Sequence, residues 1–255
     1  MINHLILTRF NLQYEADDTI GISDEWLCDR MALFEKYCLP SIQKQTVQNF
    51  RWILICDIRT PDAYKAKLEH YKELVAQIEV IYTPRLEDFN PLYRQIGNTY
   101  ASNNSTLLLT TRLDNDDALA PTYVETAQNA AACIGDGIIT FPRGRQTFVH
   151  DKRSYRVEYV SNHFTSRVEH SGFFTILGFD HTELNGFGKD VHVIYTDEPM
   201  WEEYVHGNNM LNDYLPAYKY TVTSLTDAID ITGRWLRFQA NRGKHFIKRL
   251  IKLTR

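Results

Sequence analysis

Three carboxylates follow a short apolar stretch in the middle of the sequence. The stretch Ser105–Asp117 reads S-T-L-L-L-T-T-R-L-D-N-D-D, and its carboxylates belong to Asp114, Asp116 and Asp117. Carboxylates crowded at the end of a buried strand repel one another unless a cation, hydrogen-bond donors or water compensates them. Oxygen ligands suit a hard divalent ion such as Mg²⁺ or Mn²⁺, and such an ion can hold a diphosphate. The cluster therefore predicts a metal-diphosphate site.

Another explanation of the same residues stays open. Asp and Asn are ordinary turn and N-cap residues, so Asp117 can instead cap a helix that begins near Pro121. An EF-hand fits poorly, because Leu119 stands where its loop needs a glycine, although Glu125 falls at the twelfth position. The carboxylates alone therefore leave a metal site and a turn as alternatives.

The elements before the carboxylates form a regular alternation. Apolar runs such as Leu107–Leu109 are typical of buried strands of a parallel sheet, and apolar residues repeated every three or four positions are typical of amphipathic helices. A kink or restart is expected in the first helix at Pro40. The expected strands are His4–Thr8, Phe50–Cys56, Ile78–Tyr82 and Leu107–Thr111, and the expected helices are Glu25–Gln45, Pro61–Gln77 and Leu92–Tyr100.

This alternation predicts an α/β fold with a mostly parallel central sheet and helices on both of its faces. The carboxyl ends of parallel strands meet at one edge of the sheet, and ligands of open α/β sheets bind there. Arg9, Asp57 and the D-N-D-D cluster each follow one of the expected strands. We therefore expect them to converge on one crevice.

The second half of the sequence is less regular. Residues Gln146–Val160 alternate polar and apolar side chains, which predicts an antiparallel hairpin. Pro199 follows acidic residues, which predicts a helix start. The other expected elements are a helix at Pro121–Cys133, an apolar run at Gly172–Phe179 and strands at Gly137–Phe141, Val191–Tyr195 and Tyr218–Thr223.

The size and composition favour one substantial globular domain. With 255 residues, 44% of them hydrophobic, the chain can bury a full core. No run approaches the roughly 18 to 20 apolar residues of a membrane span, and the amino terminus does not resemble a signal peptide. The four scattered cysteines fit buried thiols in a reducing compartment. We therefore expect a cytoplasmic protein.

The net charge of −4 is unevenly distributed. Ile231–Arg255 carries eight basic residues and no acidic one, so the remainder has 20 basic against 32 acidic residues. We therefore divide the chain into a catalytic domain, residues 1–230, and a basic amphipathic tail, residues 231–255. An apolar stripe within Phe246–Leu253 is typical of an interfacial helix on anionic lipid, which would make the protein peripheral on the inner face of the cell membrane. A helix docked on the acidic body is the alternative.

Four segments, taken in this order, resemble a known family. They are T-R-F at residues 8–10, L-P-S-I-Q-K-Q-T with W-I-L-I-C-D at 39–57, L-D-N-D-D at 113–117 and M-W-E-E-Y-V-H-G-N-N at 200–209. Together they are similar to a bacterial rhamnosyltransferase family related to the inverting family-two glycosyltransferases, over Leu5–Asn209. The resemblance implies a glycosyltransferase-A fold, a nucleotide-diphosphate sugar donor and a divalent metal bound by an Asp-x-Asp motif.

The resemblance also implies roles for individual residues. Asp114 would contact the donor's ribose or the metal, and Asp116 and Asp117 would hold the metal. His206 is a further candidate ligand of the metal or the diphosphate, because many metal-dependent members of this fold supply a late histidine. The remaining donor-binding candidates are Thr8, Arg9, Asp57, Arg112 and Arg234.

The implied reaction requires two kinds of chemistry. A bound Mg²⁺ or Mn²⁺ neutralises the leaving diphosphate, and a carboxylate base takes the proton of the acceptor hydroxyl. Glu198 is the first candidate for this base and Asp197 the second, because related enzymes place an acidic pair just before a helix at this point. Glu202 and Glu203 are more simply explained as acids at a helix amino terminus.

The expected function is thus transfer of a sugar, rhamnose by the family's label, to a glycan or lipid-linked acceptor; no nucleic acid is expected among the partners. Two other functions are alternatives. An aspartyl phosphotransferase also places Asp-x-Asp after a buried strand, but normally on the first strand and followed by Gly-Thr, whereas Asp117 and Ala118 follow here. A non-catalytic module that binds metal or glycan at a membrane is the other.

Overall fold

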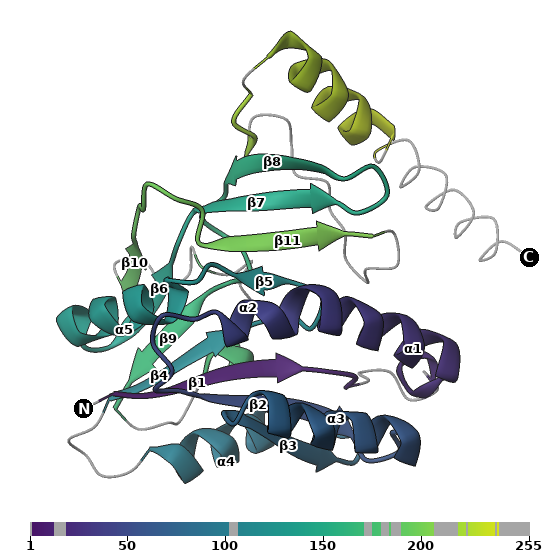
Figure 1. Ribbon diagram of the computed structural model, residues 1–255. Coiled ribbons are helices and arrows are strands. Elements are labelled where there is room, and N and C mark those ends of the chain that lie inside the picture. The colour runs from purple at the N-terminus through teal and green to yellow at the C-terminus, as the bar shows by residue number, and fades with distance from the viewer. Residues whose placement is uncertain are drawn as a thin grey trace, which may run out of the picture.

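Seven strands form the main sheet, in the order β10-β6-β9-β4-β1-β2-β3 (Figure 1). The computed structural model describes residues 2–12, 19–101, 107–170, 175–179, 184, 190–206, 219–222, 224–237 and 239. The strands run parallel except β9, which is antiparallel to both of its neighbours. Their bounds are β1 Ile2–Arg9, β2 Arg51–Asp57, β3 Ile78–Thr83, β4 Leu107–Arg112, β6 Gly137–Thr140, β9 Ser166–Glu169 and β10 Val191–Val193.

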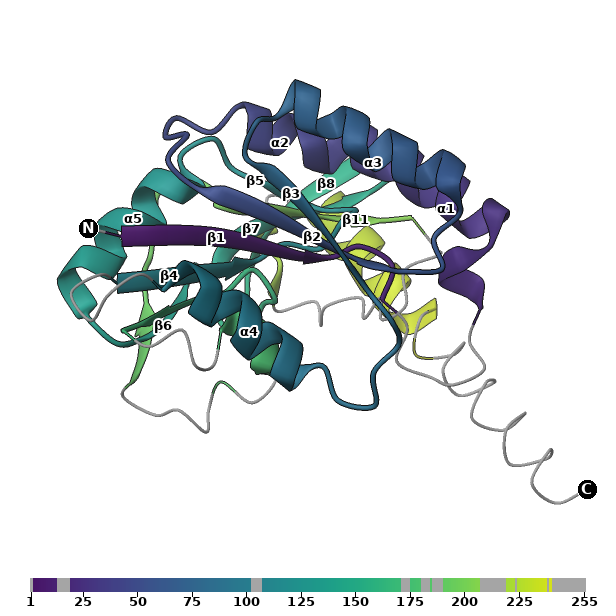
Figure 2. The ribbon, with the colours of Figure 1, turned by 90° about the horizontal axis from the view of Figure 1, so that it is seen from below.

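Helices cover both faces of this sheet, as Figure 2 shows for α3 and α4. Alternate residues of the central strands point to opposite faces, so Ile6 and Trp52 belong to one core while Leu5 and Ile53 belong to the other. The predicted mostly parallel sheet with helices on both faces is confirmed. One face carries α1 Asp24–Leu33, α2 Leu39–Gln43, α3 Asp62–Leu74 and α5 Tyr123–Ile134; the other carries α4 Asn90–Tyr100 and the 3₁₀ turn η3 Ile176–Gly178.

The first helix passes Pro40 through a wide turn. A π-helical segment, η2 Phe34–Cys38, joins α1 to α2, and the Leu39 backbone N–H donates to the Phe34 carbonyl five residues back. Proline lacks a backbone donor, and its ring clashes with the carbonyl four residues earlier in a regular helix. The wider turn therefore accommodates Pro40 where a kink was expected.

A second sheet of four strands, in the order β5-β11-β7-β8, packs beside α1 and α2 (Figure 1). Strands β7 and β8 pair antiparallel, which confirms the predicted hairpin. The strand bounds are β5 Ala118–Leu119, β7 Arg143–Phe148, β8 Arg153–Glu158 and β11 Trp201–Val205.

The prediction that a helix starts at Pro199 is wrong, because strand β11 occupies this part of the chain. Strand β11 has ladder partners on both sides, antiparallel to β5 and parallel to β7. Its first residue, Trp201, lies so close over Gly144 that a Cβ there would come within 2.2 Å of the indole ring. Pairing on both edges and this close packing outweigh the local helix signals.

The carboxyl-terminal part begins with a helix at residues 225–237. In the region of the expected strand Tyr218–Thr223, Tyr220 forms an isolated antiparallel bridge with Val157, while residues 218 and 223 lie outside the described residues. Three further segments also lie outside the described residues: the apolar stripe Phe246–Leu253, residues 172–174 of the run Gly172–Phe179, and residues 207–209. Among the helices that the structure describes, none is long and apolar enough to cross a membrane.

Candidate functional site

The D-N-D-D turn is attached to the end of β1 by backbone and side-chain hydrogen bonds. The Leu113 N–H donates to the Leu7 carbonyl at 3.1 Å, and the Asn115 side-chain amide donates to the Phe10 carbonyl at 2.5 Å. Phe10 in turn donates to the carbonyl of Ile55 in β2. The carboxyl ends of β1, β2 and β4 therefore meet at one edge, as the sequence predicted.

Asp114, Asp117 and His163 form a group that has the geometry of a cation site. One ligand atom from each of the three lies within 4.8 Å of the others, and His163 Nε2 is 2.8 Å from Asp117 Oδ2. The Tyr204 backbone N–H donates to the other oxygen of Asp117 at 2.9 Å. His163 arrives from the segment before β9, about 46 residues after the turn by position in the sequence.

Electrostatics support this fit. Burial, followed by the negative charges of Asp116 and Asp114, raises the pKa of Asp117 well above its usual range. Burial also lowers the pKa of His163, which favours the neutral imidazole that metals bind. The two carboxylates suit Mn²⁺ or Mg²⁺, the imidazole can complete the ligands of a divalent ion, and a cation would relieve the repulsion at Asp117.

Asp114 differs from Asp117 because arginines face it. Arg112 donates to both carboxylate oxygens of Asp114, at 3.1 and 2.8 Å. Burial alone would raise the pKa of Asp114, but the charge and hydrogen bonds of Arg112, together with the charge of Arg9, outweigh burial and hold that pKa below its usual range. Arg9 and Arg112 thus lie on the Asp114 side of the turn.

Asp116 is neutralised from another side. Arg30 Nη1 lies 2.5 Å from Asp116 Oδ2, and His206 Nε2 lies 3.0 Å from the same oxygen. The Arg30 and Asp116 side chains are only 7% and 9% exposed. Burial would raise the pKa of Asp116, but the hydrogen bond from His206 and the charge of Arg30 lower it. His206 is therefore brought to the motif, where it contacts Asp116.

The other donor-binding candidates occupy the same edge with different surroundings. Asp57 accepts hydrogen bonds from the Arg59 backbone at 2.7 Å and from its guanidinium at 2.6 Å, which help to lower its pKa despite burial. Thr8 is fully buried, where its hydroxyl accepts from the indole N–H of Trp52 at 2.9 Å.

Arg234 lies on the helix of residues 225–237. It pairs with Asp230 at 2.7 Å and with Asp151 in the turn between β7 and β8, and its guanidinium lies over the Phe148 ring. Its charge is compensated in this position.

Two acidic residues precede β11, and two lie within it. Asp197 and Glu198 precede the strand, at the end opposite His206, and both are exposed. Glu198 is paired with Arg156 at 2.8 Å. Glu203 is half-buried in the strand, and its carboxylate accepts from the Gln146 side chain at 3.0 Å. Burial raises the pKa of Glu203 to about 7, and the negative charge of Asp117 acts in the same direction.

Three residues of this region were not singled out from the sequence: Arg30, His163 and, as the principal acid near the cluster, Glu203. Arg30 interrupts the apolar spacing of Leu27 and Met31, and this was an available signal of a buried cation. His163 carries no such local signal, because only the return of the chain to β9 brings it to the turn.

Comparison with known proteins identifies the family. A family model described as "Putative rhamnosyl transferase" matches residues 8–217.

The chain belongs to this family.

As a member of the rhamnosyl transferase family, the protein is a glycosyltransferase. Its fold is also found in S. aureus TarS 1-349 in complex with UDP-GlcNAc, with a TM-score of 0.52 and 9% identity over 92% of this chain and 72% of that one. The predicted glycosyltransferase-A fold is thereby confirmed.

The structure of S. aureus TarS 1-349 without a named ligand gives a TM-score of 0.48 at 8% identity. The structure of the same protein in complex with UDP gives a TM-score of 0.46 at 11% identity. Each comparison covers 80% of this chain but only 60% and 61% of those chains, so the rhamnosyl transferase family member spans less than two thirds of their length. A search of curated proteins found no match.

Proposed function

We propose that this glycosyltransferase moves a sugar from a nucleotide-diphosphate donor to a hydroxyl of a glycan or lipid-linked acceptor, with inversion and with Mn²⁺ or Mg²⁺. The observation that carries the proposal is the cluster of Asp114, Asp117 and His163 at the carboxyl edge of the main sheet. The TarS structures with UDP and UDP-GlcNAc support a nucleotide-sugar donor for a chain of the same fold. Rhamnose follows the family's description, and inversion follows the family-two resemblance.

Asp114, Asp117 and His163 would hold the ion, which supplies positive charge to the leaving diphosphate when bound. Arg9 and Arg112, on the Asp114 side, would add further positive charge for the same diphosphate. Arg30 and His206 would fix the turn through Asp116 rather than complete the ion's ligands. This proposal shifts the metal set away from Asp116 and His206, which the sequence favoured.

The proposed base is Glu203. It precedes Tyr204, whose backbone N–H donates to Asp117, and the charge of Asp117 acts on its carboxylate. One of its oxygens accepts from Gln146, which leaves the other oxygen to take the proton of the acceptor hydroxyl. As that hydroxyl oxygen bonds to the sugar carbon, the bond from this carbon to the diphosphate breaks on the opposite face. Glu198 and Asp197 remain the candidates that the sequence favoured.

A thermal-shift experiment tests the donor site. UDP, dTDP and GDP are each added with Mn²⁺ or with chelator to the wild type and to Asp114→Asn. Ligand at about 100 times its dissociation constant adds about 2.7 kcal/mol to the free energy of unfolding, which is a measurable shift. We expect a metal-dependent shift with one nucleotide in the wild type and its loss in Asp114→Asn.

The matched control is Glu198→Gln, because Glu198 is 76% exposed at the other end of β11 and should leave nucleotide binding unchanged. Absence of a shift with every nucleotide, or a shift that persists in chelator, would contradict the proposed site.

A further inference from the structure

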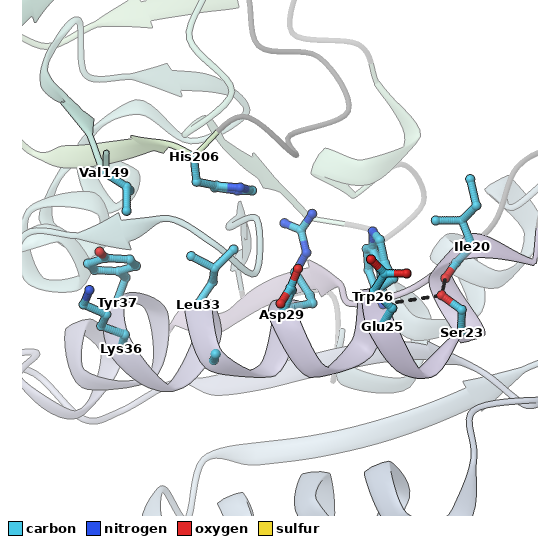
Figure 3. Close-up of a pocket in the computed structure, with 12 residues that line it drawn as sticks. Ile20, Ser23, Glu25, Trp26, Asp29, Leu33, Lys36, Tyr37, Val149 and His206 are labelled. Atoms are coloured by element: carbon cyan, nitrogen blue, oxygen red, sulfur yellow. Dashed lines mark hydrogen bonds between the residues drawn. The ribbon is translucent and has the colours of Figure 1, made fainter. Parts of the chain in front are cut away.

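A cavity of about 560 Å³ lies next to the carboxylate turn, between α1 and the second sheet (Figure 3). Trp26, Asp29 and Leu33 of α1 line one side, and Val149 and His206 lie across from this helix. This volume is within the range of small-molecule sites, about 300 to 1,000 Å³. The cavity has no role in the donor site described above.

The lining has the chemistry of a site for an uncharged, hydroxyl-rich ligand. Trp26 is half-buried and presents aromatic surface, which packs against the apolar face of a sugar ring, whereas the Tyr37 ring is already stacked on Tyr204. Glu25 and Asp29 are exposed carboxylates that can accept hydrogen bonds from hydroxyl groups. The same carboxylates repel a diphosphate. These two carboxylates face one exposed lysine of the lining, Lys36, and the charge of Arg30 is already paired with Asp116.

The position of the cavity separates it from the donor side. Arg30 and His206 line the cavity and also contact Asp116. Arg112 instead pairs with Asp114, and neither of these residues lines the cavity. A ligand in the cavity therefore lies beside the turn without occupying the arginine-lined side.

We propose that this cavity binds the acceptor saccharide. The proposal rests on the proposed function, because it assigns the acceptor half of the same reaction. Trp26 provides the surface on which a sugar ring packs, and Asp29 orients its hydroxyls.

Saturation-transfer NMR tests the proposal with the methyl glycosides of L-rhamnose, D-glucose, D-galactose and N-acetyl-D-glucosamine as probes. We expect at least one glycoside to bind the wild type, and we expect Trp26→Ala and Asp29→Ala each to weaken it by about tenfold, or 1.4 kcal/mol. Asp62→Ala is the matched control, since Asp62 is a fully exposed carboxylate on α3. The metal-dependent nucleotide shift should be unchanged in all three variants.

The outcomes separate the two proposals. A nucleotide shift without glycoside binding, or with glycoside binding that neither cavity variant weakens, would overturn the acceptor assignment while the donor site stands. Glycoside binding that both cavity variants weaken, in a protein that shows no nucleotide shift, would support the cavity as a saccharide site and contradict the proposed donor site.

A different observation concerns the helix of residues 225–237. Leu225, Ile229 and Leu236 are 77%, 65% and 54% exposed. At about 100° per residue, the three side chains lie within about 40° of one another around the helix axis. They form an outward apolar face at the periphery of the molecule, beyond β8 in Figure 1.

Contacts on the opposite side fix this orientation. Ile231 is buried, and Asp230 accepts from the Tyr155 hydroxyl at 2.7 Å. Arg234 pairs with both Asp230 and Asp151. These anchors hold one side of the helix on the β7–β8 hairpin and leave the apolar face outward.

Charge indicates what covers this face. The sequence from Ile231 to Arg255 has eight basic residues and no acidic one. Asp227 and Asp230, the acids within the helix, lie at least about 100° away from the centre of the apolar face. An apolar face on a helix that leads in sequence into a net positive segment suits an anionic lipid surface, whereas two copies would bring like charges together. We infer that Leu225, Ile229 and Leu236 insert into an anionic membrane surface.

Vesicle co-sedimentation of the full chain tests this second inference. We expect binding to phosphatidylglycerol–phosphatidylcholine vesicles, weaker binding to phosphatidylcholine alone, and a fall of about tenfold in Leu225→Ser/Ile229→Ser. The control is Ile58→Ser/Leu74→Ser, which alters two apolar side chains that are each 50% exposed elsewhere.

Three results would overturn the inference. They are no binding to anionic vesicles, equal binding by the helix variant and the wild type, and a dimer in light scattering that the helix variant abolishes.

Discussion

The carboxylates of the D-N-D-D turn differ in whether a neighbouring side chain of the protein compensates their charge. Asp116 is enclosed by Arg30 and His206, which supply positive charge or hydrogen bonds within the protein. Asp117 is buried beside other acids, and its pKa is raised, while Asp114 shares with it a histidine and the space for a cation. Asp114 is intermediate, because Arg112 pairs with it while its side chain stays 32% exposed beside Asp117 and His163.

Neighbouring side chains thus give the carboxylates of one short motif different electrostatic surroundings. A buried carboxylate with an internal cation is already compensated and gains little from a metal, whereas crowded carboxylates are stabilised by one. The comparison leads to four predictions.

The largest expected effect is on turnover, on the Asp117 side. Glu203→Gln removes the proposed base and should lower kcat about 10²- to 10⁴-fold while nucleotide binding survives. Glu198→Gln should stay close to the wild-type rate, because Glu198 is exposed and paired with Arg156. Rates of sugar transfer to the acceptor measure the difference. Inactivation by Glu198→Gln alone would return the base to the residue that the sequence favoured.

The second prediction concerns stability on the Asp116 side. Arg30→Met leaves a buried carboxylate without its cation and should lower the free energy of unfolding by about 3 to 5 kcal/mol in urea. Arg112→Met is the matched variant, and it should cost less because its partner Asp114 is 32% exposed. Equal losses in the two variants would remove the distinction between the sides.

The third prediction separates the two histidines by Mn²⁺ affinity. His163→Gln should weaken Mn²⁺ binding about 10- to 100-fold, since it removes a proposed ligand. His206→Gln should change it much less, because His206 contacts Asp116. Titration calorimetry with Mn²⁺ measures both. A larger loss in His206→Gln would restore the ligand set expected from the resemblance.

The smallest expected effect is on how the free energy of unfolding depends on pH. Asp114 and Asp117 should each change it by at most about 1.4 kcal/mol per pH unit, in protein kept in chelator. Asp117 has a raised folded-state pKa, so its ionisation destabilises the fold as the pH rises above 3.8. Asp114 has a lowered one, so its contribution is present above pH 3.8 and is lost as the pH falls. Relative to the wild type, Asp117→Asn should therefore gain stability with rising pH and Asp114→Asn should lose it. Urea unfolding from about pH 3, just below the ordinary pKa of an aspartate, to about pH 8 detects the opposite signs, with the effect of Asp114 confined to the acid end; slopes of the same sign would contradict the assignment.

The local patterns of the first half were sufficient to predict its fold. The strands around Leu5, Ile53 and Leu108 are apolar on both faces, and only a parallel sheet covered by helices buries such strands completely. From that topology alone, Arg9, Asp57 and Asp114 had to reach one edge. The second half was less predictable, because the choice of strand for Trp201–Val205 depended on β5 and β7 as partners.

The sequence by itself determined the parallel sheet, the edge at which its polar residues meet and the presence of crowded carboxylates there, because these follow from local periodicity and the direction of the strands. Only the tertiary structure decided that Arg30 neutralises Asp116, that His163 joins Asp114 and Asp117, and that Glu203 rather than Glu198 lies near them. These relations join residues far apart in the chain. Their electrostatics depend on burial and on distances of a few ångströms, which no local pattern encodes.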